Sequence, residues 1–473
     1  MNSSMQSTPA DMILPRYDAV VVGSGLGGLT CANRLAGAGH SVLLLEHHSR
    51  LGGLATWFRR GGHTFDVSLH GFPYGMVKTC RKYWGRAIRD AIVQLPHIVF
   101  DNPQFSLTTT FSKEDFIRIL QERFGVTAAT VNEFLATVDA MNFYDDRSLT
   151  TRALFTRFFP GRTDIHRLLM EPITYANGST LDEPAITYGI VFSNFMNRGV
   201  YTFEGGTDRL IGLMAGELRG KGVHIRTGAR VERILVENGR VCGVQVGGRR
   251  IGANAVVSNA GITNTVEELV GRERFSPDFR EQFNAVRVNN SSCQVYFGIR
   301  RGETIPEIGD LLFTSTAPEF SSDEMRRMDT RSRTFSVYYP KTRPEAEPDH
   351  TIVASMNANY DDWAELDAES YRQAKTALVE RCFNDLERYV PGVRAKVDTV
   401  EAATPRTFQR YTLHTRGTSF GTKFEGLDIS RTLHREIPGL FHVGSVGIIM
   451  SGWLGAINYG VIVANDVDAH LHD

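Results

Sequence analysis

The chain contains no paired cysteines and has almost no excess of charge of either sign. Its cysteines are Cys31, Cys80, Cys242, Cys293 and Cys382. They are widely spaced and form no CxxC pair, which argues against a disulfide framework and a structural metal site, and fits a reducing, cytoplasmic compartment. The 52 Lys and Arg residues balance 53 Asp and Glu residues, so the charge gives no reason to expect a nucleic-acid partner.

Features of a secreted or membrane-spanning protein are also missing. The first 15 residues, MNSSMQSTPADMILP, lack the basic-then-apolar plan of a signal peptide, and we expect them to be a loose tail. Residues 439–465 contain no Asp, Glu, Lys or Arg and exceed the ~20 residues that a membrane span needs. However, this segment contains six glycines, two asparagines, two serines and a histidine, which favours a buried strand, turn and helix.

A glycine-rich turn follows the first apolar run of the chain. Residues 18–23, DAVVVG, are apolar without alternation, which predicts a parallel strand covered on both faces. The GxGxxG spacing that follows is typical of dinucleotide binding: its first glycine permits a tight turn, its second admits a pyrophosphate, and its third lets a helix pack on the strand. We expect that helix over residues 27–38, with its N-terminus facing the phosphates. The cofactor-binding residues expected here are Gly23, Ser24, Gly25, Leu26 and Gly28.

A second strand and an acid complete this unit. Residues 41–45, SVLLL, predict the strand, and Glu46 follows Gly23 at a little over the spacing of about 20 residues at which an acid binds the ribose hydroxyls. A carboxylate at this position repels a 2′-phosphate, which excludes NADP. The alternative is a glycine-rich turn in an unrelated α/β protein, but the ordered series of strand, turn, helix, strand and acid favours a dinucleotide site.

The residues after this acid distinguish between NAD and FAD. The stretch from Glu46 to Thr56, EHHSRLGGLAT, resembles the E-x3-R-x-G-G-x-x-x-[ST] extension of the FAD-binding amine-oxidase and phytoene-desaturase superfamily. Its arginine can neutralise a diphosphate, and its two glycines let a second backbone segment close over the isoalloxazine side, which NAD does not require. Read as structure alone, LGG would be a helix C-cap. The FAD-binding residues expected here are Glu46, His47, Arg50, Gly52, Gly53 and Leu54.

Flavin domains of this superfamily are assembled from segments far apart in the sequence, and a later stretch resembles such a return. The segment YTFEGG, which begins at Tyr201, precedes an amphipathic helix, and strands with turns at 237–239 and 247–248 follow. This order resembles the GG-x-x-x-L helix of the superfamily and its next strand, in which a valine, here Val231, contacts the adenine through its backbone. The alternative is an ordinary β-meander.

The uncharged segment near the C-terminus resembles a third part of the flavin domain. Residues 439–444 predict a strand that ends in glycine, and a helix follows from about Gly452 to Ala469. Its expected buried face consists of Leu454, Ile457, Val461 and Ile462. The dipole of such a helix would stabilise negative charge on the N1/O2 edge of a flavin. The superfamily often has an acid after this strand, where this chain has a serine. The expected cofactor contacts are Gly444, Ser445, Gly452, Trp453 and Leu454.

The length of 473 residues exceeds the size at which one core keeps growing, so we expect at least two substructures. We predict an α/β fold, in which a Rossmann-type FAD-binding domain of three layers (ββα) carries an inserted α+β substrate domain. The FAD-binding segments are expected at 16–75, 200–290 and 400–473. The substrate-binding segments are expected at 76–199, which looks mainly helical, and at 291–399, which looks like strands followed by a helix.

The order of these segments resembles most closely the branch that contains phytoene desaturase, carotenoid isomerase and retinol saturase. Residues 62–67, GHTFDV, are similar to its FDxG segment, with Ser68 in place of the glycine, and residues 404–411 are similar to the segment before its closing flavin motif. The resemblance implies noncovalent FAD and an apolar, conjugated or isoprenoid substrate. Aromatic clusters such as FTRFF are either core or the wall of an apolar tunnel, whose entrance could touch a membrane surface.

For such a substrate the expected reaction is desaturation, saturation or cis-trans isomerisation, by hydride transfer between an allylic carbon and flavin N5. His70 is the first candidate for the proton carrier, because a histidine can titrate near neutral pH. A structural histidine is the alternative. Tyr74, Arg410 and Tyr411 are candidates to orient a polar end group. NAD(P)H, a quinone or O2 are the expected transient electron partners, although no second GxGxxG predicts a nicotinamide domain.

Two other functions stay open at this point. An amine or amino-acid oxidase would share the flavin scaffold, although FAD cannot be attached through a cysteine of the closing motif, because the last cysteine is Cys382. A flavin-binding module without turnover would keep the cofactor residues and have no productive substrate. The sequence leaves the oligomeric state open.

Overall fold

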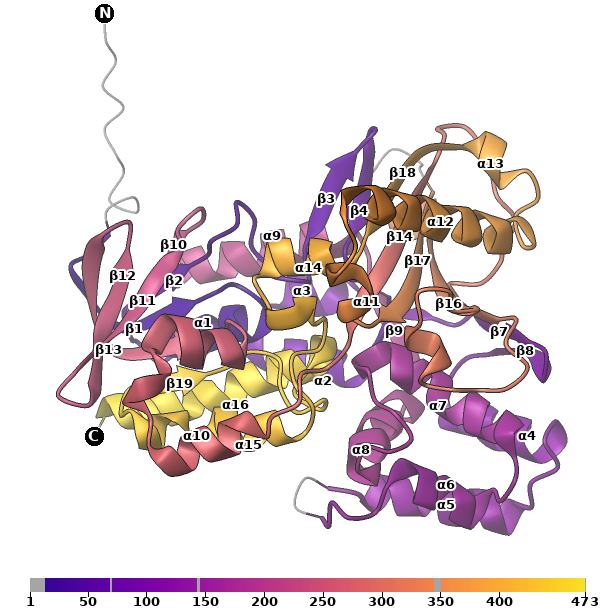
Figure 1. The fold of residues 1–473 in the computed structure, drawn as a ribbon, viewed down its shortest axis with the longest axis horizontal. Coiled ribbons are helices and arrows are strands. Elements are labelled where there is room, and N and C mark those ends of the chain that lie inside the picture. The colour runs from indigo at the N-terminus through magenta and orange to yellow at the C-terminus, as the bar shows by residue number, and fades with distance from the viewer. Residues whose placement is uncertain (1–12, 69, 143–144, 344–349, 473) are drawn as a thin grey trace, which may run out of the picture.

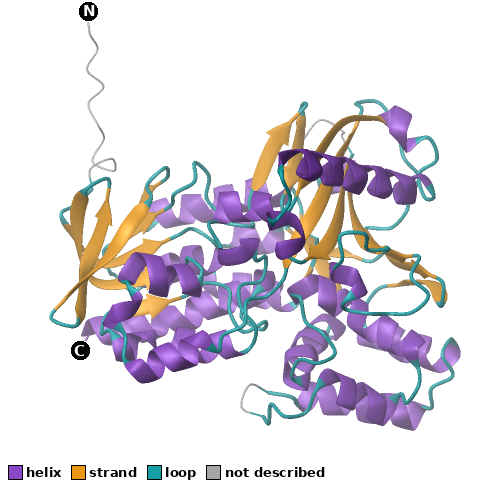
Figure 2. Cartoon of the chain, viewed as in Figure 1, coloured by secondary structure: helices purple, strands orange, loops and turns teal. Residues whose placement is uncertain are grey.

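The computed structural model describes residues 13–68, 70–142, 145–343 and 350–472 (Figure 1). Within these residues the chain forms two seven-stranded sheets, a three-stranded sheet and a two-stranded sheet. Figure 2 shows the strands of the two large sheets as separate groups along the long axis of the molecule, with helices between and beside them. Most of the tail expected at the N-terminus lies outside the described residues.

The first large sheet has a parallel, Rossmann-like centre, in which β10, β2, β1, β13 and β19 run parallel. Its strands are β1 (Arg16–Val22), β2 (Val42–Leu45), β10 (His224–Arg226), β11 (Val231–Glu237), β12 (Arg240–Val246), β13 (Arg249–Ser258) and β19 (Leu440–His442). Strands β11, β12 and β13 pair antiparallel in the expected hairpins, and β13 also pairs parallel with β1, so these hairpins are part of the Rossmann-like sheet and not a separate meander. The opening unit and the two later segments of the chain therefore meet in one sheet.

Three helices, α1 (Leu26–Gly37), α9 (Gly206–Gly220) and α16 (Gly452–His472), accompany this sheet. Helices α1 and α16 pack closely together. Gly460 allows this approach because it has no Cβ atom; a Cβ atom there would lie only 2.6 Å from the carbonyl oxygen of Gly27. The buried face expected for α16 is wrong at Ile462, which is 41% exposed. This residue lies about 140° around the helix from the fully buried Ile457. None of the helices within the described residues, α16 included, is long and apolar enough to cross a membrane.

The second large sheet follows the order β18-β14-β17-β16-β15-β7-β8. Its strands are β7 (Ile98–Asn102), β8 (Phe105–Thr109), β14 (Ser291–Ile299), β15 (Leu311–Ser315), β16 (Ser332–Tyr338), β17 (Thr351–Ala358) and β18 (Val397–Ala403). Helix α12 (Ala368–Glu387) covers one face and buries Leu378, Cys382 and Leu386 there. Strands β7 and β8 come from a stretch that looked mainly helical, and the domain boundary expected at residue 400 falls inside β18.

Helices from the middle of the chain pack beside this second sheet, at the lower right of Figure 1. They are α4 (Lys113–Glu122), α5 (Ala128–Ala140), α6 (Thr151–Phe158), α7 (Thr163–Asn177) and α8 (Ala185–Met196). Their shared core is rich in phenylalanine, and Ser112, Thr127 and Thr150 cap the N-termini of α4, α5 and α6. Most of the aromatic clusters noted in the sequence are therefore core.

Shorter elements join these parts. The strands are β3 (Trp57–Arg60), β4 (His63–Asp66), β5 (Phe72–Pro73), β6 (Ile92–Leu95) and β9 (Val200–Phe203). The helices are α2 (Gly75–Tyr83), α3 (Arg86–Asp90), α10 (Pro277–Asn284), α11 (Asp361–Ala364), α13 (Val393–Lys396), α14 (Pro405–Thr412) and α15 (Glu425–Glu436). The β3–β4 hairpin and α14 pack on the second sheet through a cluster that includes Phe65, Tyr296 and Phe408.

Candidate active site

A cavity of about 1810 Å³ is lined by residues of both large sheets. The glycine turn after β1, the acid after β2 and the start of α16 line one end, which we call the dinucleotide end. Residues of α7, α8 and strands β14 to β17 line the other, which we call the substrate end. Sites for small molecules usually measure about 300–1,000 Å³, so this cavity has room for two ligands.

The glycine turn leaves the N-terminus of α1 without a side-chain cap at Gly25. The free backbone amides of the first turn of α1 are therefore available to a ligand bound at the dinucleotide end of the cavity. A Cβ atom at Gly25 would lie 2.5 Å from Asn259 Oδ1, and one at Gly28 would lie 2.3 Å from the carbonyl oxygen of Gly23. Gly28 does not line the cavity, so its role is the close packing of helix on strand that the fingerprint predicts.

Glu46 is almost fully buried and accepts hydrogen bonds on both carboxylate oxygens. The backbone amide and hydroxyl of Ser24 donate to Oε2 at 2.9 and 2.6 Å, while the amide of His48 and Nδ1 of His47 bond Oε1 at 2.8 and 2.9 Å. Burial alone would raise the pKa of Glu46, but these bonds outweigh it and hold the pKa below its usual range. A sugar hydroxyl would reach this carboxylate by replacing one of the two side-chain donors.

The second glycine pair packs directly on the first turn. Gly52 donates its amide to the carbonyl oxygen of Ser24 at 3.0 Å, and a Cβ atom at Gly53 would lie 3.0 Å from the Cα atom of Gly25. Both glycines have a positive φ and no helix precedes them, so the C-cap interpretation is wrong. Arg50 also lines the cavity, with its guanidinium 5.7 Å from the ring centre of Trp57.

The closing segment brings Ser445, Gly452, Trp453 and Leu454 to the cavity wall, and Val231 joins them from the start of β11. The indole of Trp453 donates to the carbonyl oxygen of Ser68 at 3.2 Å and stacks on another aromatic ring. Unlike its neighbours, the expected contact Gly444 does not line the cavity. A Cβ atom there would lie 2.5 Å from the carbonyl oxygen of Ala260, so its glycine serves packing.

His70 lines the cavity and is held by side chains of the second sheet. Because the hydroxyl of Tyr296 donates to Gln294 Oε1, the amide nitrogen of Gln294 faces His70 and donates to Nε2 at 3.2 Å. The proton then resides on Nδ1, which donates to Ser336 Oγ at 2.8 Å, while Ser355 Oγ lies 3.3 Å from Nε2. Burial lowers the pKa of His70 to about 4. The expectation that it titrates near neutral pH is therefore wrong, and the ring is neutral.

The other three residues expected at the reaction centre lie elsewhere. Tyr74 does not line the cavity and packs against Arg198, whose guanidinium lies 4.6 Å from its ring centre. Tyr411 is 53% exposed and its backbone oxygen bonds His47 at 3.1 Å, next to Glu46. Arg410 and Tyr411 thus lie at the dinucleotide end, and the structure brings neither to His70.

Residues 26–467 match the family described as flavin-containing amine oxidoreductases. The chain belongs to this family. The flavoprotein is 23% identical to human all-trans-retinol 13,14-reductase, over 98% of this chain and 87% of that protein. It is 24% identical to a chloroplastic prolycopene isomerase from Arabidopsis thaliana, over 99% and 85% of the two chains. These are distant relatives over most of their length, and family membership implies a flavin cofactor.

Solved structures share the fold of the flavoprotein. An oxidoreductase from Methanosarcina mazei superimposes with a TM-score of 0.68 at 18% identity, over 95% of this chain and 99% of that one. Putrescine oxidase bound to putrescine gives a TM-score of 0.64 at 15% identity, over 96% and 99%. Such low identities show the fold alone, a Rossmann-like parallel sheet with a second, mixed sheet.

Sequence reasoning about the flavoprotein missed the partners of His70 and the polar residues near them. Gln294, Ser336 and Ser355 lie on three different strands, and Asn177 lies at the end of α7. The usable signal was the alternation of polar and apolar residues in SSCQVYFGIR, which places its polar residues on one face of a strand. Only the sheet order shows that this face meets the cavity.

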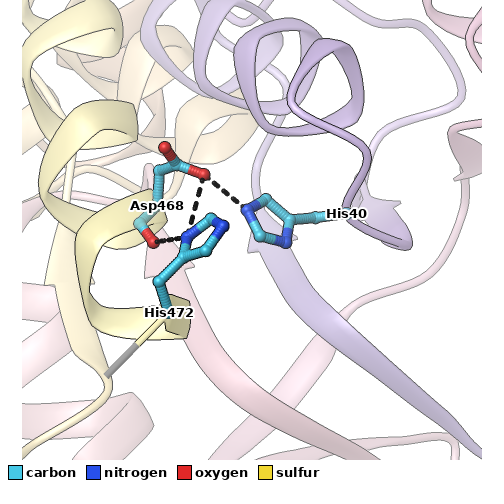
Figure 3. A group of neighbouring side chains, drawn as sticks. All are labelled: His40, Asp468 and His472. Atoms are coloured by element: carbon cyan, nitrogen blue, oxygen red, sulfur yellow. Dashed lines mark hydrogen bonds and ion pairs between the residues drawn. The ribbon is translucent and has the colours of Figure 1, made fainter.

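A second group of histidines lies outside the cavity (Figure 3). His40, in the turn between α1 and β2, bonds Asp468 with its Nε2 atom 2.6 Å from Oδ1, and His472 bonds the backbone oxygen of Asp468 at 2.7 Å. These residues could offer three ligand atoms within 4.8 Å of one another. Their observed bonds tie the end of α16 to the turn after α1.

Proposed function

We propose that this flavoprotein holds FAD without a covalent bond and acts on C–C or C=C bonds of an apolar polyene or isoprenoid substrate. The single observation that carries this proposal is the continuous cavity, which joins a dinucleotide-type turn to a substrate end that includes a cluster of apolar side chains. The full-length likeness to a retinol reductase and a prolycopene isomerase supports this substrate class.

The residues at the dinucleotide end fit FAD. The uncapped start of α1 offers amides and a positive dipole end to a diphosphate, and Arg50 offers a cation on the same wall. Glu46 is kept charged and would accept from a ribose hydroxyl, and the glycine at 452 presents backbone rather than a side chain to the cavity, where a flavin ring would bind. No cysteine is among the described residues that line the cavity, which supports noncovalent binding.

Bound FAD would supply hydride acceptance and donation at its N5 atom. The chain would supply position, exclusion of water and a hydrogen-bonding group. His70 is neutral, with Nδ1–H donated to Ser336, so its Nε2 atom can accept a proton from a substrate carbon only if Gln294 releases it. NAD(P)H, a quinone or O2 is the proposed external electron partner.

Anaerobic mixing of the purified holoprotein with carotenoids, retinoids and amines tests the proposal. We expect the flavin absorbance near ~450 nm to bleach, or the polyene spectrum to change, with an isoprenoid and not with amines. Hydrogen peroxide formed with amines alone would indicate an amine oxidase instead. Bleaching by dithionite and by no candidate substrate would indicate a flavin-binding module without turnover.

The His70→Ala variant tests the site within this reaction. We expect turnover to fall by about 10²-fold or more if His70 takes part in proton transfer, with the flavin content per chain unchanged. The matched control is His414→Ala, because His414 also lines the cavity and is half-buried, but its ring bonds the backbone oxygen of Thr418, outside the second sheet. Equal turnover of wild type and His70→Ala would remove His70 from the mechanism.

A further inference from the structure

The face of the second sheet that meets the cavity is polar along its central strands. On β14, Ser292 and Gln294 line the cavity, while the alternate residues Cys293 and Val295 point into the core against α12. On β17, Asn357 lines the cavity in the same way. This pattern is the reverse of what a site for a pure hydrocarbon requires, because buried polar groups cost free energy unless they are hydrogen-bonded.

The polarity changes across the sheet. We call the cavity face of β14, β17 and β16, with Gln294, Ser355, Asn357 and Thr334, the polar half. The next strands in the sheet, β15 and β7, present Leu311, Phe313 and Ile98 to the same cavity, and α8 adds Ile190, Val191 and Phe195. We call these six residues the apolar half. A single molecule that spans the substrate end therefore meets hydrogen-bonding groups at one end and hydrocarbon at the other.

Two polar groups at the end of α7 have no partner among the described residues. The amide of Asn177 is oriented by Ser179, whose backbone N–H donates to Oδ1 at 2.9 Å, so the unpaired atom is the donor Nδ2. Asn177 is only 3% exposed and lines the cavity. The hydroxyl of Tyr175 is likewise buried and unpaired. An unsatisfied buried donor costs about 1–3 kcal/mol, which a ligand group of matching chemistry would offset.

The end of α7 contacts the polar half and lies beside the start of α16. Asn357 Nδ2 donates to the carbonyl oxygen of Thr174 at 3.0 Å, which joins β17 to α7. A Cβ atom at Gly452 would lie 3.7 Å from the carbonyl oxygen of Ala176, which places the start of α16 next to the same turn. The unpaired groups are therefore on the side of the substrate end that adjoins the proposed flavin ring.

The lining of the substrate end carries no formal charge. Among the described cavity residues of α7, α8, β7 and β14 to β17 there is no Asp, Glu, Lys or Arg. The carboxylates and cations that line the cavity, such as Glu46, Arg50 and Arg410, belong to other elements. An ionised carboxylate or ammonium would be left unpaired here, which is far more costly than burying a neutral polar group. Arg167 and Glu171 form a buried pair, 3.4 Å apart, that does not line the cavity.

We propose that the polar half and the end of α7 form a head-group subsite for one neutral hydrogen-bonding group, a hydroxyl or a carbonyl, of an amphipathic isoprenoid. The apolar half holds the hydrocarbon tail of the same molecule. This inference rests on the proposed function, which it narrows from polyenes in general to chains with one uncharged polar end. The amide of Asn177 donates to the head group, and the hydroxyl of Tyr175 adds a second donor or acceptor.

The test uses the holoprotein and a matched series of C20 isoprenoids that differ only in their terminal group: methyl, alcohol, aldehyde, carboxylate or ammonium. Dissociation constants are measured at pH 7 from the perturbation of the flavin spectrum. We expect the alcohol and the aldehyde to bind at least about 10-fold more tightly than the methyl-terminated chain and than either ion, since one good hydrogen bond is worth about this factor. A methyl-terminated chain that binds within twofold of the alcohol, or an ion that binds most tightly, would overturn the proposal.

Two variants locate the subsite. Tyr175→Phe removes only an unpaired hydroxyl, so it should fold normally and reduce the preference for the alcohol over the methyl-terminated chain. Asn177→Asp keeps the acceptor bonded to Ser179 and replaces the free donor with a carboxylate oxygen, so the aldehyde should lose affinity at least about 10-fold and the ammonium chain should gain. An unchanged ranking of ligands in both variants would contradict the assignment of these residues.

The matched control is Asn194→Asp on α8. Asn194 also lines the cavity but donates to the carbonyl oxygen of Ile190 at 2.7 Å, among the apolar half. The ranking of the neutral ligands should not change there. The outcomes separate the two proposals: a protein that takes up no FAD refutes the proposed function, whereas one that binds FAD and prefers the methyl-terminated chain refutes only the subsite.

Discussion

The two ends of the cavity recognise their ligands by different means. At the dinucleotide end the chain presents backbone: Gly25, Gly52 and Gly53 pack so closely that Cβ atoms would collide, and the start of α1 is uncapped. At the substrate end the chain presents side chains, such as Gln294 and Asn177, from elements far apart in the sequence. The first end tolerates no added atoms, whereas the second should tolerate exchange of side chains and change its preference.

The sharpest test of this difference is Gly28→Ala. The new Cβ atom would lie 2.3 Å from the carbonyl oxygen of Gly23, which is backbone and cannot move aside. We expect a loss of stability of about 3 kcal/mol or more and a protein with little bound flavin. Thermal unfolding and the flavin content per chain measure this. Gly216→Ala on α9 is the control, since no atom lies within 4 Å of that Cβ position. Normal flavin content in Gly28→Ala would contradict the claim that the dinucleotide end tolerates no added atoms.

Acid should destabilise the folded protein through His442, which lies on β19 and does not line the cavity. This residue is buried, bonds Ser430 at 2.6 Å and the backbone of Ala260 at 2.9 Å, and burial lowers its pKa to about 4 from 6.5. The unfolded chain takes up this proton below pH 6.5 while the folded chain does not, so stability is complete above pH 6.5 and falls on acidification. The loss should reach about 2 kcal/mol at pH 5.

Chemical denaturation between pH 7 and pH 5 measures this effect. The His442→Gln variant should lose less stability than the wild type over this pH range, because it lacks the buried imidazole. His70 at the substrate end has the same lowered pKa of about 4 but faces the cavity. A flavin or another ligand in the cavity should therefore change the contribution of His70 to the pH dependence of stability and leave the contribution of His442 unchanged. A slope that is identical in wild type and His442→Gln would contradict this assignment.

Glu46→Gln should weaken FAD binding at the dinucleotide end without unfolding the protein. The amide can accept bonds on only one oxygen, so donors from Ser24 or His48 lose their partner. We expect the dissociation constant for FAD to rise about 10- to 100-fold, measured by titration of the flavin-free protein. Glu232→Gln is the control, because this exposed acid also lines the cavity. An equal change in both variants would show that charge alone, and not the bonds of Glu46, matters.

The smallest effect is expected from His40→Ala, outside both ends. Its bond to Asp468 is partly exposed, and such pairs contribute about 0.2–1 kcal/mol. The midpoint of denaturation should fall slightly, while flavin content and ligand ranking stay the same. A loss of flavin in this variant would show that the joint between α1 and α16 supports the dinucleotide end more strongly than its contacts indicate.

Much of the dinucleotide end could be predicted, because its parts lie within about thirty consecutive residues and follow local rules. The strand, turn, helix and acid from β1 to Glu46 agree with the sequence, as do the two later segments that complete this sheet. Tyr74, Arg410 and Tyr411 were predicted at the reaction centre with His70, but the structure does not bring them there. Their positions depend on how the β5–α2 turn and α14 pack, which no local pattern specifies.

The sequence by itself determined the parallel strands, the glycine turns and the charged acid after β2, because glycine spacing and apolar runs act over short distances. Only the tertiary structure decided which face of the second sheet meets the cavity, that His70 is neutral, and that the Nδ2 atom of Asn177 has no partner among the described residues. Burial and hydrogen-bond partners arise when strands from residues 291 to 358 assemble beside α7, and a side chain acquires its pKa and its unpaired groups only in that assembly.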